Sequence, residues 1–241
     1  MQIIISETHE ESSKKAAAAT ANAMQGKTNP LICVASGDSP AGLYAHLVAS
    51  VQQQILDIQD WTFLGLDEWV GLNGNDEGSC RYHLNAQLFN ALQIPEERIC
   101  FFDAAAADLE QQCQQTETAI QNHGGIELAI LGLGMNGHIG MNEPNTSALK
   151  RSHVIELDPI TAEVGQKYFQ TPRKLTQGIT LGMANLMESK TIILIVNGAK
   201  KANILKQVVE GEISEKLPAS ILRLHPNCFL FADQAAAQLI L

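Results

Sequence analysis

The sequence predicts an α/β fold with a mostly parallel sheet and helices on both of its faces. Three observations lead to this fold class. Short apolar runs alternate with longer amphipathic runs along the whole chain. The apolar runs, such as 128–131 (LAIL), lack the polar alternation of a sheet with one solvated face. At 241 residues, the chain is long enough for one full hydrophobic core.

We expect residues 1–241 to form a single domain, because no repeat, low-complexity linker or charge block marks a boundary. Strands are expected in the apolar runs at 2–5, 30–35, 62–66, 98–102, 128–131, 154–157, 191–196 and 228–232. Helices are expected between them at 7–24, 41–56, 79–92, 104–122, 161–169 and 200–209. This alternation is typical of parallel strands joined by crossover helices.

The chain is acidic, with a formal net charge of -10 and a pI near 5.1. Nucleic-acid binding needs clustered lysine and arginine to neutralise phosphates, and the sequence has no basic stripe. An acidic chain can still bind one small phosphate through a few local cations and backbone amides. These features argue against a nucleic-acid partner and leave room for a small anionic molecule.

The cysteines and the N-terminus indicate the compartment. Five cysteines are scattered without a C-x-x-C pair, which is typical of reduced structural cysteines rather than a disulfide framework or a zinc site. The N-terminal residues form a short apolar run followed by acidic residues, unlike a signal peptide. No apolar run approaches membrane-spanning length. We expect a cytoplasmic protein with no membrane partner and no bound metal.

The most informative stretch is 127–144 (ELAILGLGMNGHIGMNEP). It begins as a buried strand and then breaks at three glycines, which let the backbone turn sharply and approach a ligand. His138 and Glu143 follow on a loop at the carboxyl end of that strand, where open α/β sheets bind their ligands. A lone histidine is more often structural, but an imidazole held by a carboxylate is a common acid–base arrangement.

A competing interpretation treats residues 132–137 as the dinucleotide fingerprint G-x-G-x-x-G. Glu156 and Asp158 lie about 20 residues further on, as the fingerprint requires. A dinucleotide site also needs a helix that begins at the last glycine. Pro144 and the glycine-interrupted residues before it argue against such a helix. The sequence therefore favours a catalytic loop over a nucleotide site.

Residues 36–40 (SGDSP) form a turn between an expected strand and the helix that follows it. Small residues in such a turn expose backbone N–H groups, and the helix dipole adds attraction for an anion. An ordinary serine N-cap explains the same residues equally well. A nucleophile at Ser39 is disfavoured, because the glycine spacing has one residue too many for a G-x-S-x-G elbow. Asp38 would repel a phosphate unless its side chain turns away.

Two acidic residues, Asp67 and Glu68, follow the expected strand 62–66. Successive residues of an extended chain point in opposite directions, so only one of the two can face a pocket. Asp67 is a candidate general base with Glu68 as its structural partner. A polar strand end that caps the next turn is the alternative.

Cationic candidates lie at the start of the expected helix 200–209. Lysines at a helix N-terminus oppose the helix dipole, and an anion bound there would resolve the conflict. Lys200 is the candidate at this position, whereas a solvated Lys201 needs no such explanation. Lys167 and Arg173 are further candidates on weaker grounds.

Three of these segments resemble the glucosamine-6-phosphate deaminase and 6-phosphogluconolactonase superfamily. SGDSP at 36–40 is similar to its phosphate loop T-G-x-T-P, and LDEWVGL at 66–72 is similar to D-E-Y-V-G-L. GHIGMNEP at 137–144 resembles the motif G-H-I-x-F-N-E-P, whereas the lactonase branch usually has G-H-T-A-S-L-F-P without the glutamate. The resemblance covers nearly the whole chain and favours the deaminase side. It implies a Rossmann-like fold of the sugar-phosphate isomerase type.

The resemblance also implies a reaction, the deaminating isomerisation of a 2-amino-2-deoxy-hexose 6-phosphate. In this interpretation His138 protonates the ring oxygen, Glu143 orients His138, and Asp67 moves a proton from C2 to C1. No metal or organic cofactor is implied. The implied phosphate-binding residues are Ser36, Gly37, Asp38, Ser39, Lys167 and Lys200.

The chain departs from the family at Asn136, where glucosamine members have aspartate in D-G-H. Asparagine can hold the loop or bond His138, but it cannot raise the pKa of His138 through charge. Asn136 resembles members assigned to galactosamine 6-phosphate, which shifts the expected substrate modestly towards that epimer. The chain ends at Leu241, without the longer C-terminal segment of allosteric hexameric members. We expect a monomer or small homo-oligomer without allosteric activation.

Two other functions stay open on the sequence. A 6-phosphogluconolactonase would hydrolyse an ester with the same phosphate loop and His138. A catalytically silent sugar-phosphate-binding protein is a third interpretation, which Asn136 allows.

Overall fold

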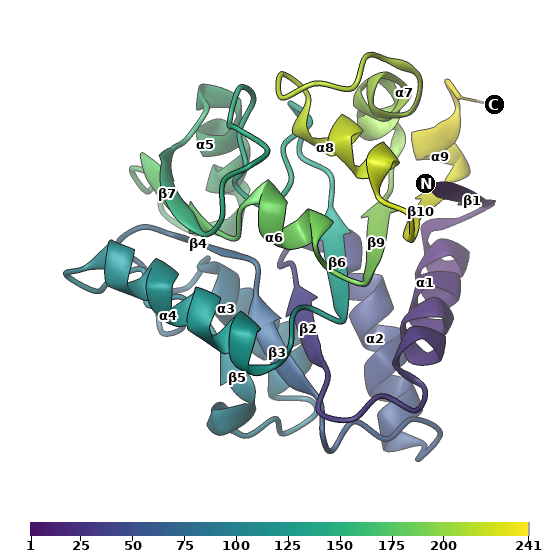
Figure 1. Ribbon diagram of the computed structural model, residues 1–241. Coiled ribbons are helices and arrows are strands. Elements are labelled where there is room, and N and C mark those ends of the chain that lie inside the picture. Colours follow the sequence, from purple (N-terminus) through teal and green to yellow (C-terminus); the bar gives the residue numbers. More distant parts are fainter. Residues whose placement is uncertain (241) are drawn as a thin grey trace.

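A seven-stranded, fully parallel sheet forms the centre of the structure, a computed structural model that describes residues 1–240 (Figure 1). Neighbouring strands pair in parallel register throughout the sheet. The strands are, in spatial order, β1 (Gln2–Ser6), β10 (Cys228–Asp233), β9 (Thr191–Val196), β6 (Leu128–Gly132), β2 (Leu31–Val34), β3 (Thr62–Gly65) and β5 (Ile99–Cys100). The predicted parallel sheet is confirmed.

Helices cover both faces of this sheet, as predicted. The longer ones are α1 (His9–Met24), α2 (Asp38–Gln52), α4 (Leu109–Asn122), α5 (Pro159–Gly165) and α7 (Ala202–Glu210). The short ones are α3 (Cys80–Leu84), α6 (Met183–Met187), α8 (Pro218–Ile221) and α9 (Gln234–Ala237). A π-helical turn extends α3 at Asn85–Phe89, and 3-10 turns lie at Glu96–Arg98, Gln166–Tyr168, Ala199–Lys201 and Leu222–Leu224.

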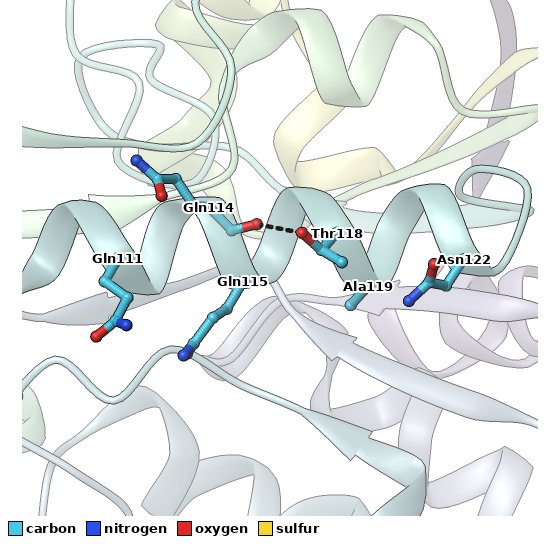
Figure 2. A pocket seen from close by; sticks show the side chains of 6 residues that line it. All are labelled: Gln111, Gln114, Gln115, Thr118, Ala119 and Asn122. Carbon is cyan, nitrogen blue, oxygen red and sulfur yellow. Dashed lines mark hydrogen bonds between the residues drawn. The ribbon is translucent and has the colours of Figure 1, made fainter.

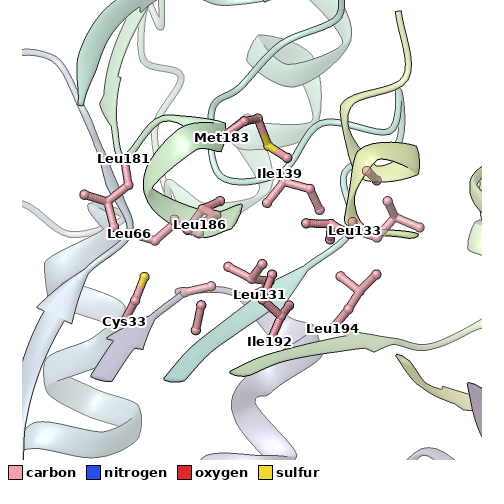
Figure 3. Packing of buried hydrophobic residues seen from close by; sticks show 14 of the residues in the cluster. Cys33, Leu66, Leu131, Leu133, Ile139, Leu181, Met183, Leu186, Ile192 and Leu194 are labelled. Carbon is pink, nitrogen blue, oxygen red and sulfur yellow. The ribbon is translucent and has the colours of Figure 1, made fainter. Parts of the chain in front are cut away.

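Alternate residues of each strand bury on opposite faces, which explains the near-continuous apolar runs of the sequence. In β2, Ile32 and Val34 pack towards α1 and α2, whereas Leu31 and Cys33 join the core under α4, α6 and α7. Figure 3 shows Cys33 of this second cluster together with side chains from β6, β9 and α6. Both faces of the central strands are therefore dry, and only the strand ends reach solvent.

Local capping explains where several helices differ from their predicted bounds. The helix expected at 104–122 begins at Leu109, because the Asp108 side chain accepts the N–H of Gln111 at 2.9 Å. The helix expected at 41–56 spans Asp38–Gln52, since Gly37 takes a positive φ of 106° and starts the helix earlier. The predicted strand at 98–102 is shorter, with only Ile99–Cys100 paired.

A small antiparallel sheet, which the sequence did not predict, lies beside the parallel one. Its order is β4 (Asp67–Trp69), β8 (Gln177–Thr180) and β7 (His153–Glu156). The run expected at 154–157 is therefore a strand, but it belongs to this second sheet. The chain enters it directly after β3, because Leu66 bonds on both sides: its N–H donates to Val34 and its carbonyl accepts from Leu181.

The strand order creates a switch point between β2 and β6. From β2 the chain proceeds outward through β3 and β5, whereas from β6 it proceeds in the other direction through β9 and β10. Connections that leave in opposite directions open a crevice at the carboxyl ends of the two central strands. The fold thus fixes one place for a ligand site.

Within residues 1–240, no helix is long and apolar enough to cross a membrane.

Candidate active site

A cleft of about 950 Å³ opens at the switch point, above the carboxyl ends of the parallel strands. Each of the four central strands contributes the segment that follows it, and α5 with its 3-10 turn covers one side. The lining residues fall within 35–40, 66–69, 132–141, 160–168 and 197–201, together with Cys80. The fold therefore gathers the chemistry-bearing segments of the sequence, far apart along the chain, into one cavity.

A second hollow of about 410 Å³ lies along α4 (Figure 2). Its lining consists of amide side chains, Ala119 and the hydroxyl of Thr118, which donates to the carbonyl of Gln114 at 2.9 Å. No charged or titratable side chain lines this surface hollow, so it offers neither acid–base chemistry nor a grip on an anion.

His138 lines the cleft and is held by a network of neighbouring side chains. Its Nδ1 lies 3.0 Å from the Thr161 hydroxyl and 3.5 Å from the Glu143 carboxylate. The ring packs against Gly134, where any Cβ would collide with it. Because Nδ1 is engaged with its neighbours, Nε2 is the nitrogen left for a ligand. The glycine that broke the strand pattern is thus required for the imidazole to fit.

Glu143 orients this network and keeps its negative charge. Burial alone would raise the pKa of Glu143, but contacts with His138, Thr161 and Asn136 hold that pKa below its ordinary value. Its second oxygen accepts the N–H of Asp158 at 3.2 Å, which ties the loop to the start of α5. The predicted pairing of His138 with a carboxylate is therefore present in the structure.

Asn136 lies behind His138 and does not line the cleft. Its amide nitrogen donates to Glu143 at 2.9 Å, and its amide oxygen accepts the backbone N–H of His138 at 3.1 Å. Asparagine supplies both a donor and an acceptor here, whereas an ionised aspartate could only accept. Asn136 therefore holds the loop in shape and has no contact with the space where a ligand would bind.

Asp67 faces the cleft, and Glu68 faces the protein interior. The structure thus confirms that only one of the two adjacent acids reaches the pocket. Burial raises the pKa of Asp67 to about 7, and the nearby charge of Glu68 adds to the rise. A carboxylate that titrates near neutral pH can both accept and return a proton under ordinary conditions.

Glu68 serves as an anchor for α3. One of its oxygens accepts the N–H groups of Trp69 and Cys80, each at 2.9 Å, and the other accepts the N–H of Arg81 at 2.9 Å. The side chain is fully buried. Glu68 therefore accepts hydrogen bonds from N–H groups that have no intrahelical partner at the N-terminus of a short helix. These bonds fix that helix against the strand that carries Asp67.

Residues 36–40 line the cleft at the N-terminus of α2, the position that the sequence predicted for them. Gly37 caps α2 with a positive φ, and the first N–H groups of a helix have no intrahelical partners and can bind an anion. A Cβ on Gly37 would come within 2.9 Å of the Tyr168 hydroxyl, so only glycine fits. Asp38 turns outward and pairs with Lys167 at 2.6 Å, which removes the repulsion expected from its charge.

Lys201 is a cleft residue that sequence reasoning missed. Its amine donates to the carbonyl of Leu133, and burial together with the charge of Lys167 lowers its pKa to about 8. Lys200 also lines the cleft but is exposed. Helical spacing does not separate the two lysines, because each lies four residues before a buried residue of α7, Ile204 or Leu205. The candidate Arg173 does not line the cleft.

Comparison with known proteins identifies the family of the chain. The family of glucosamine-6-phosphate isomerases and 6-phosphogluconolactonases matches residues 6–230. The chain belongs to this family. A glucosamine-6-phosphate deaminase of Oceanobacillus iheyensis is 38% identical over 239 residues, which cover 99% of this chain and 96% of the relative. A glucosamine-6-phosphate deaminase of Thermoanaerobacter pseudethanolicus is 35% identical over 241 residues, covering 100% and 95%.

Solved structures of both branches of the family, deaminase and lactonase, resemble the chain to different degrees. The structure of a monomeric glucosamine-6-phosphate deaminase matches with a TM-score of 0.95 at 34% identity, covering 99% of this chain and 100% of that one. A 6-phosphogluconolactonase from Trypanosoma brucei matches with a TM-score of 0.74 at 18% identity, covering 98% and 97%. The lactonase shares the fold, whereas the similarity in sequence lies on the deaminase side of the family.

The anchoring role of Glu68 predicts a stability change. Glu68→Ala leaves three backbone donors unpaired in the interior, so we expect the free energy of unfolding to fall by about 3 kcal/mol. Urea unfolding of the two proteins measures this difference, with the exposed Glu212→Ala as the control. A loss below about 0.5 kcal/mol, equal to an ordinary surface substitution, would contradict the role.

Proposed function

We propose that the protein converts a 2-amino-2-deoxy-hexose 6-phosphate to a ketohexose 6-phosphate with release of ammonia. One observation carries the proposal. The cleft is lined by the His138 imidazole, which lies beside the Glu143 carboxylate, and by Asp67, whose pKa is raised to about 7. The N-terminus of α2, which suits a phosphate, lines the same cleft. The deaminases that match over the whole chain support the same reaction.

Ring opening is the first step of the proposed reaction, and His138 is placed to catalyse it. Breaking the C1–O5 bond of a hexose ring needs a proton delivered to O5 and a proton removed from the C1 hydroxyl, which becomes the C1 carbonyl. The Nε2 atom of His138 is the available donor, since Glu143 and Thr161 engage Nδ1. The Glu143 carboxylate stabilises the imidazole both as imidazolium and in the orientation needed for transfer.

Asp67 then acts on the open chain. Its carboxylate removes the C2 proton while the C1 carbonyl oxygen regains the proton that the C1 hydroxyl lost on ring opening, which gives an enolamine. The carboxylic acid of Asp67 then returns its proton to C1. The resulting C2 iminium takes up water and expels ammonia, which leaves a ketone at C2. A carboxyl with a pKa of about 7 suits this double role, because neither of its protonation states is strongly favoured at neutral pH.

The phosphate binds at the opposite end of the cleft in this proposal. The backbone amides of Ser36, Gly37 and Ser39 supply donors at the N-terminus of α2, and Lys201 supplies a positive charge. Lys167 is held by Asp38, so its ammonium already lies next to this loop. Lys200 lines the same wall from its exposed position and adds charge at the rim.

The configuration at C4 of the sugar has opposing support. The matching relatives are named glucosamine-6-phosphate deaminases, which favours glucosamine 6-phosphate. The sequence motif around Asn136 favours galactosamine 6-phosphate. The Asn136 side chain contacts Glu143 and His138 and does not line the cleft, so its position adds no further support for that epimer. We take glucosamine 6-phosphate as the first substrate to test and its C4 epimer as the second.

A monomer, or a small oligomer, without allosteric activation is part of the proposal. The similarity to a monomeric deaminase along the full chain supports it. A cytoplasmic location stays a prediction.

The proposed activity is tested by ammonia release from both hexosamine 6-phosphates, with 6-phosphogluconolactone as the rival substrate and EDTA present. We expect ammonia and ketose phosphate in equal amounts. Asp67→Asn is expected to reduce kcat at least 1000-fold and to leave binding of the sugar phosphate largely intact, since the amide cannot take the C2 proton. Lactone hydrolysis without ammonia would refute the proposal. Binding of the sugars without turnover would instead support a catalytically silent sugar-phosphate-binding protein.

The two lysines of the cleft are expected to differ. Lys201→Ala removes the half-buried amine and should raise KM about 10- to 100-fold, because a hydrogen bond to a charged group contributes about 1.5–3 kcal/mol. Lys200→Ala is the matched control and should raise KM less than threefold, since its exposed charge is screened by solvent. Steady-state kinetics at fixed ionic strength measures both. A larger rise of KM in Lys200→Ala than in Lys201→Ala would show that Lys200 is the lysine that binds the phosphate.

The pH dependence follows from two shifted pKa values. Asp67 is raised to about 7 and works as the carboxylate, so kcat/KM should rise with pH through about 7. Lys201 is lowered to about 8 and binds phosphate as the ammonium, so kcat/KM should fall through about 8. Lys201→Arg keeps its charge and should remove its share of the upper limb. An upper limb that is identical in Lys201→Arg would belong to another group, such as the substrate amine.

A further inference from the structure

The helix α5 contacts the histidine network of the cleft at two points. The hydroxyl of Thr161 lies 3.0 Å from Nδ1 of His138, and the N–H of Asp158, the N-cap residue of α5, donates to Glu143 at 3.2 Å. Thr161 also lines the cleft. The proposed reaction assigns the proton transfer to His138 and gives Thr161 no function of its own.

The two oxygen atoms near Nδ1 of His138 are not equivalent. An N–H···O hydrogen bond spans about 2.7–3.2 Å, so the Thr161 oxygen at 3.0 Å lies within this range and the Glu143 oxygen at 3.5 Å lies outside it. The Glu143 oxygens have closer donors, the amide of Asn136 at 2.9 Å and the N–H of Asp158 at 3.2 Å. The directional hydrogen bond on the imidazole is therefore made with the hydroxyl, and the carboxylate acts on the imidazole through its charge.

A hydroxyl in this position suits an imidazole that gives a proton from Nε2. An imidazolium carries hydrogen on both nitrogen atoms, and the hydrogen on Nδ1 remains after Nε2 has lost its proton. Nδ1 is thus a donor before and after the transfer, and the Thr161 oxygen can accept from it in both states. The hydrogen bond is kept throughout the transfer, so the ring has no reason to turn.

The contact between Thr161 and His138 is well shielded from solvent. Thr161 is only 4% exposed, whereas the preceding residue of α5, Ile160, is 47% exposed. Water therefore competes weakly for the hydroxyl. The imidazole also packs against Gly134, where any Cβ would collide with it. His138 is thus held by a glycine from the loop after β6 and by a hydroxyl from α5, and a displacement of either would change the direction of Nε2.

We propose that Thr161 is a positioning residue for ring opening, whose hydroxyl accepts the Nδ1–H of His138 and so directs Nε2 at the ring oxygen of the sugar. The inference rests on the proposed function, because it assigns His138 the proton transfer to that oxygen. It makes the acid dependent on α5. The 3-10 turn after α5 carries Lys167, which pairs with Asp38 beside the anion-binding turn. The segment that covers the cleft therefore connects the phosphate end of the sugar to the acid that opens its ring.

The test compares ammonia release from glucosamine 6-phosphate, unlabelled and deuterated at C2, for the wild type and three variants. Thr161→Val keeps the branched shape without the hydroxyl, and we expect kcat/KM to fall about 10- to 100-fold. Ring opening then limits the rate before the C2 proton is removed, so the deuterium isotope effect on kcat/KM should be about 1. Thr161→Ser keeps the hydroxyl and should stay within about threefold of the wild type. Thr116 is buried in α4 outside the cleft, and Thr116→Val should match the wild type in both measurements.

A purely structural role for Thr161 would disturb the cleft as a whole and slow the step at C2 as well. An unchanged kcat/KM in Thr161→Val, or a lowered kcat/KM with an isotope effect clearly above 1, therefore overturns the inference. An equal loss in Thr161→Ser and Thr161→Val overturns it too. If Thr161→Val does not fold, Thr161→Ala takes its place with the same two expected results. Failure of the wild type to release ammonia would instead refute the proposed function, so the two failures are distinct.

Discussion

The structure depends on the burial of two adjacent carboxyl groups where the chain leaves the parallel sheet. After Leu66 the backbone passes from β3 into β4, so Asp67 and Glu68 point to opposite sides of an extended segment. Glu68 meets three backbone N–H groups and fixes α3. Asp67 meets none of these donors and faces the cleft with a pKa near 7. Glu68 thus stabilises the fold, whereas Asp67 has a pKa near neutral pH, as proton transfer in the proposed reaction requires.

The cleft that receives Asp67 is closed by contacts between segments far apart in the chain. The ion pair between Asp38 and Lys167 joins the start of α2 to the 3-10 turn after α5, and Tyr168 packs against Gly37 at the same place. Asp158 at the start of α5 also donates to Glu143. The segment that covers the cleft is therefore bonded both to the anion-binding turn and to the histidine network, so its position influences both ends of a bound sugar phosphate.

The parallel sheet could be predicted because its strands are buried on both faces and read as apolar runs. The small antiparallel sheet could not, because β8 (QGIT) is four residues long, is partly polar and contains a glycine. Its pairing with β4 depends on the contact of Leu66 with Leu181, which no local pattern records. Local caps such as Asp108 account for the displaced helix ends.

The candidate site was predictable where sequence neighbours share a loop, and not where distant elements meet. His138 and Glu143 lie five positions apart and could be paired from the sequence, whereas Thr161 reaches the same imidazole from α5, 23 positions away. Lys201 was set aside as solvated because two adjacent lysines look alike in sequence. Its contact with the carbonyl of Leu133, a distant residue, distinguishes it from Lys200. The backbone N–H of Cys80 donates to Glu68 across 12 positions, a contact that no local sequence pattern records.

As a buried carboxyl, Asp67 is expected to titrate near neutral pH and to exchange protons with a substrate. Carbon NMR of protein labelled at the aspartate carboxyl carbon, followed from pH 4 to pH 9, measures this directly. We expect one aspartate signal whose titration midpoint lies near pH 7, and we expect this signal to be absent from the Asp67→Asn variant. If every aspartate carboxyl were to titrate below about pH 5, as ordinary aspartates do, the account would be contradicted.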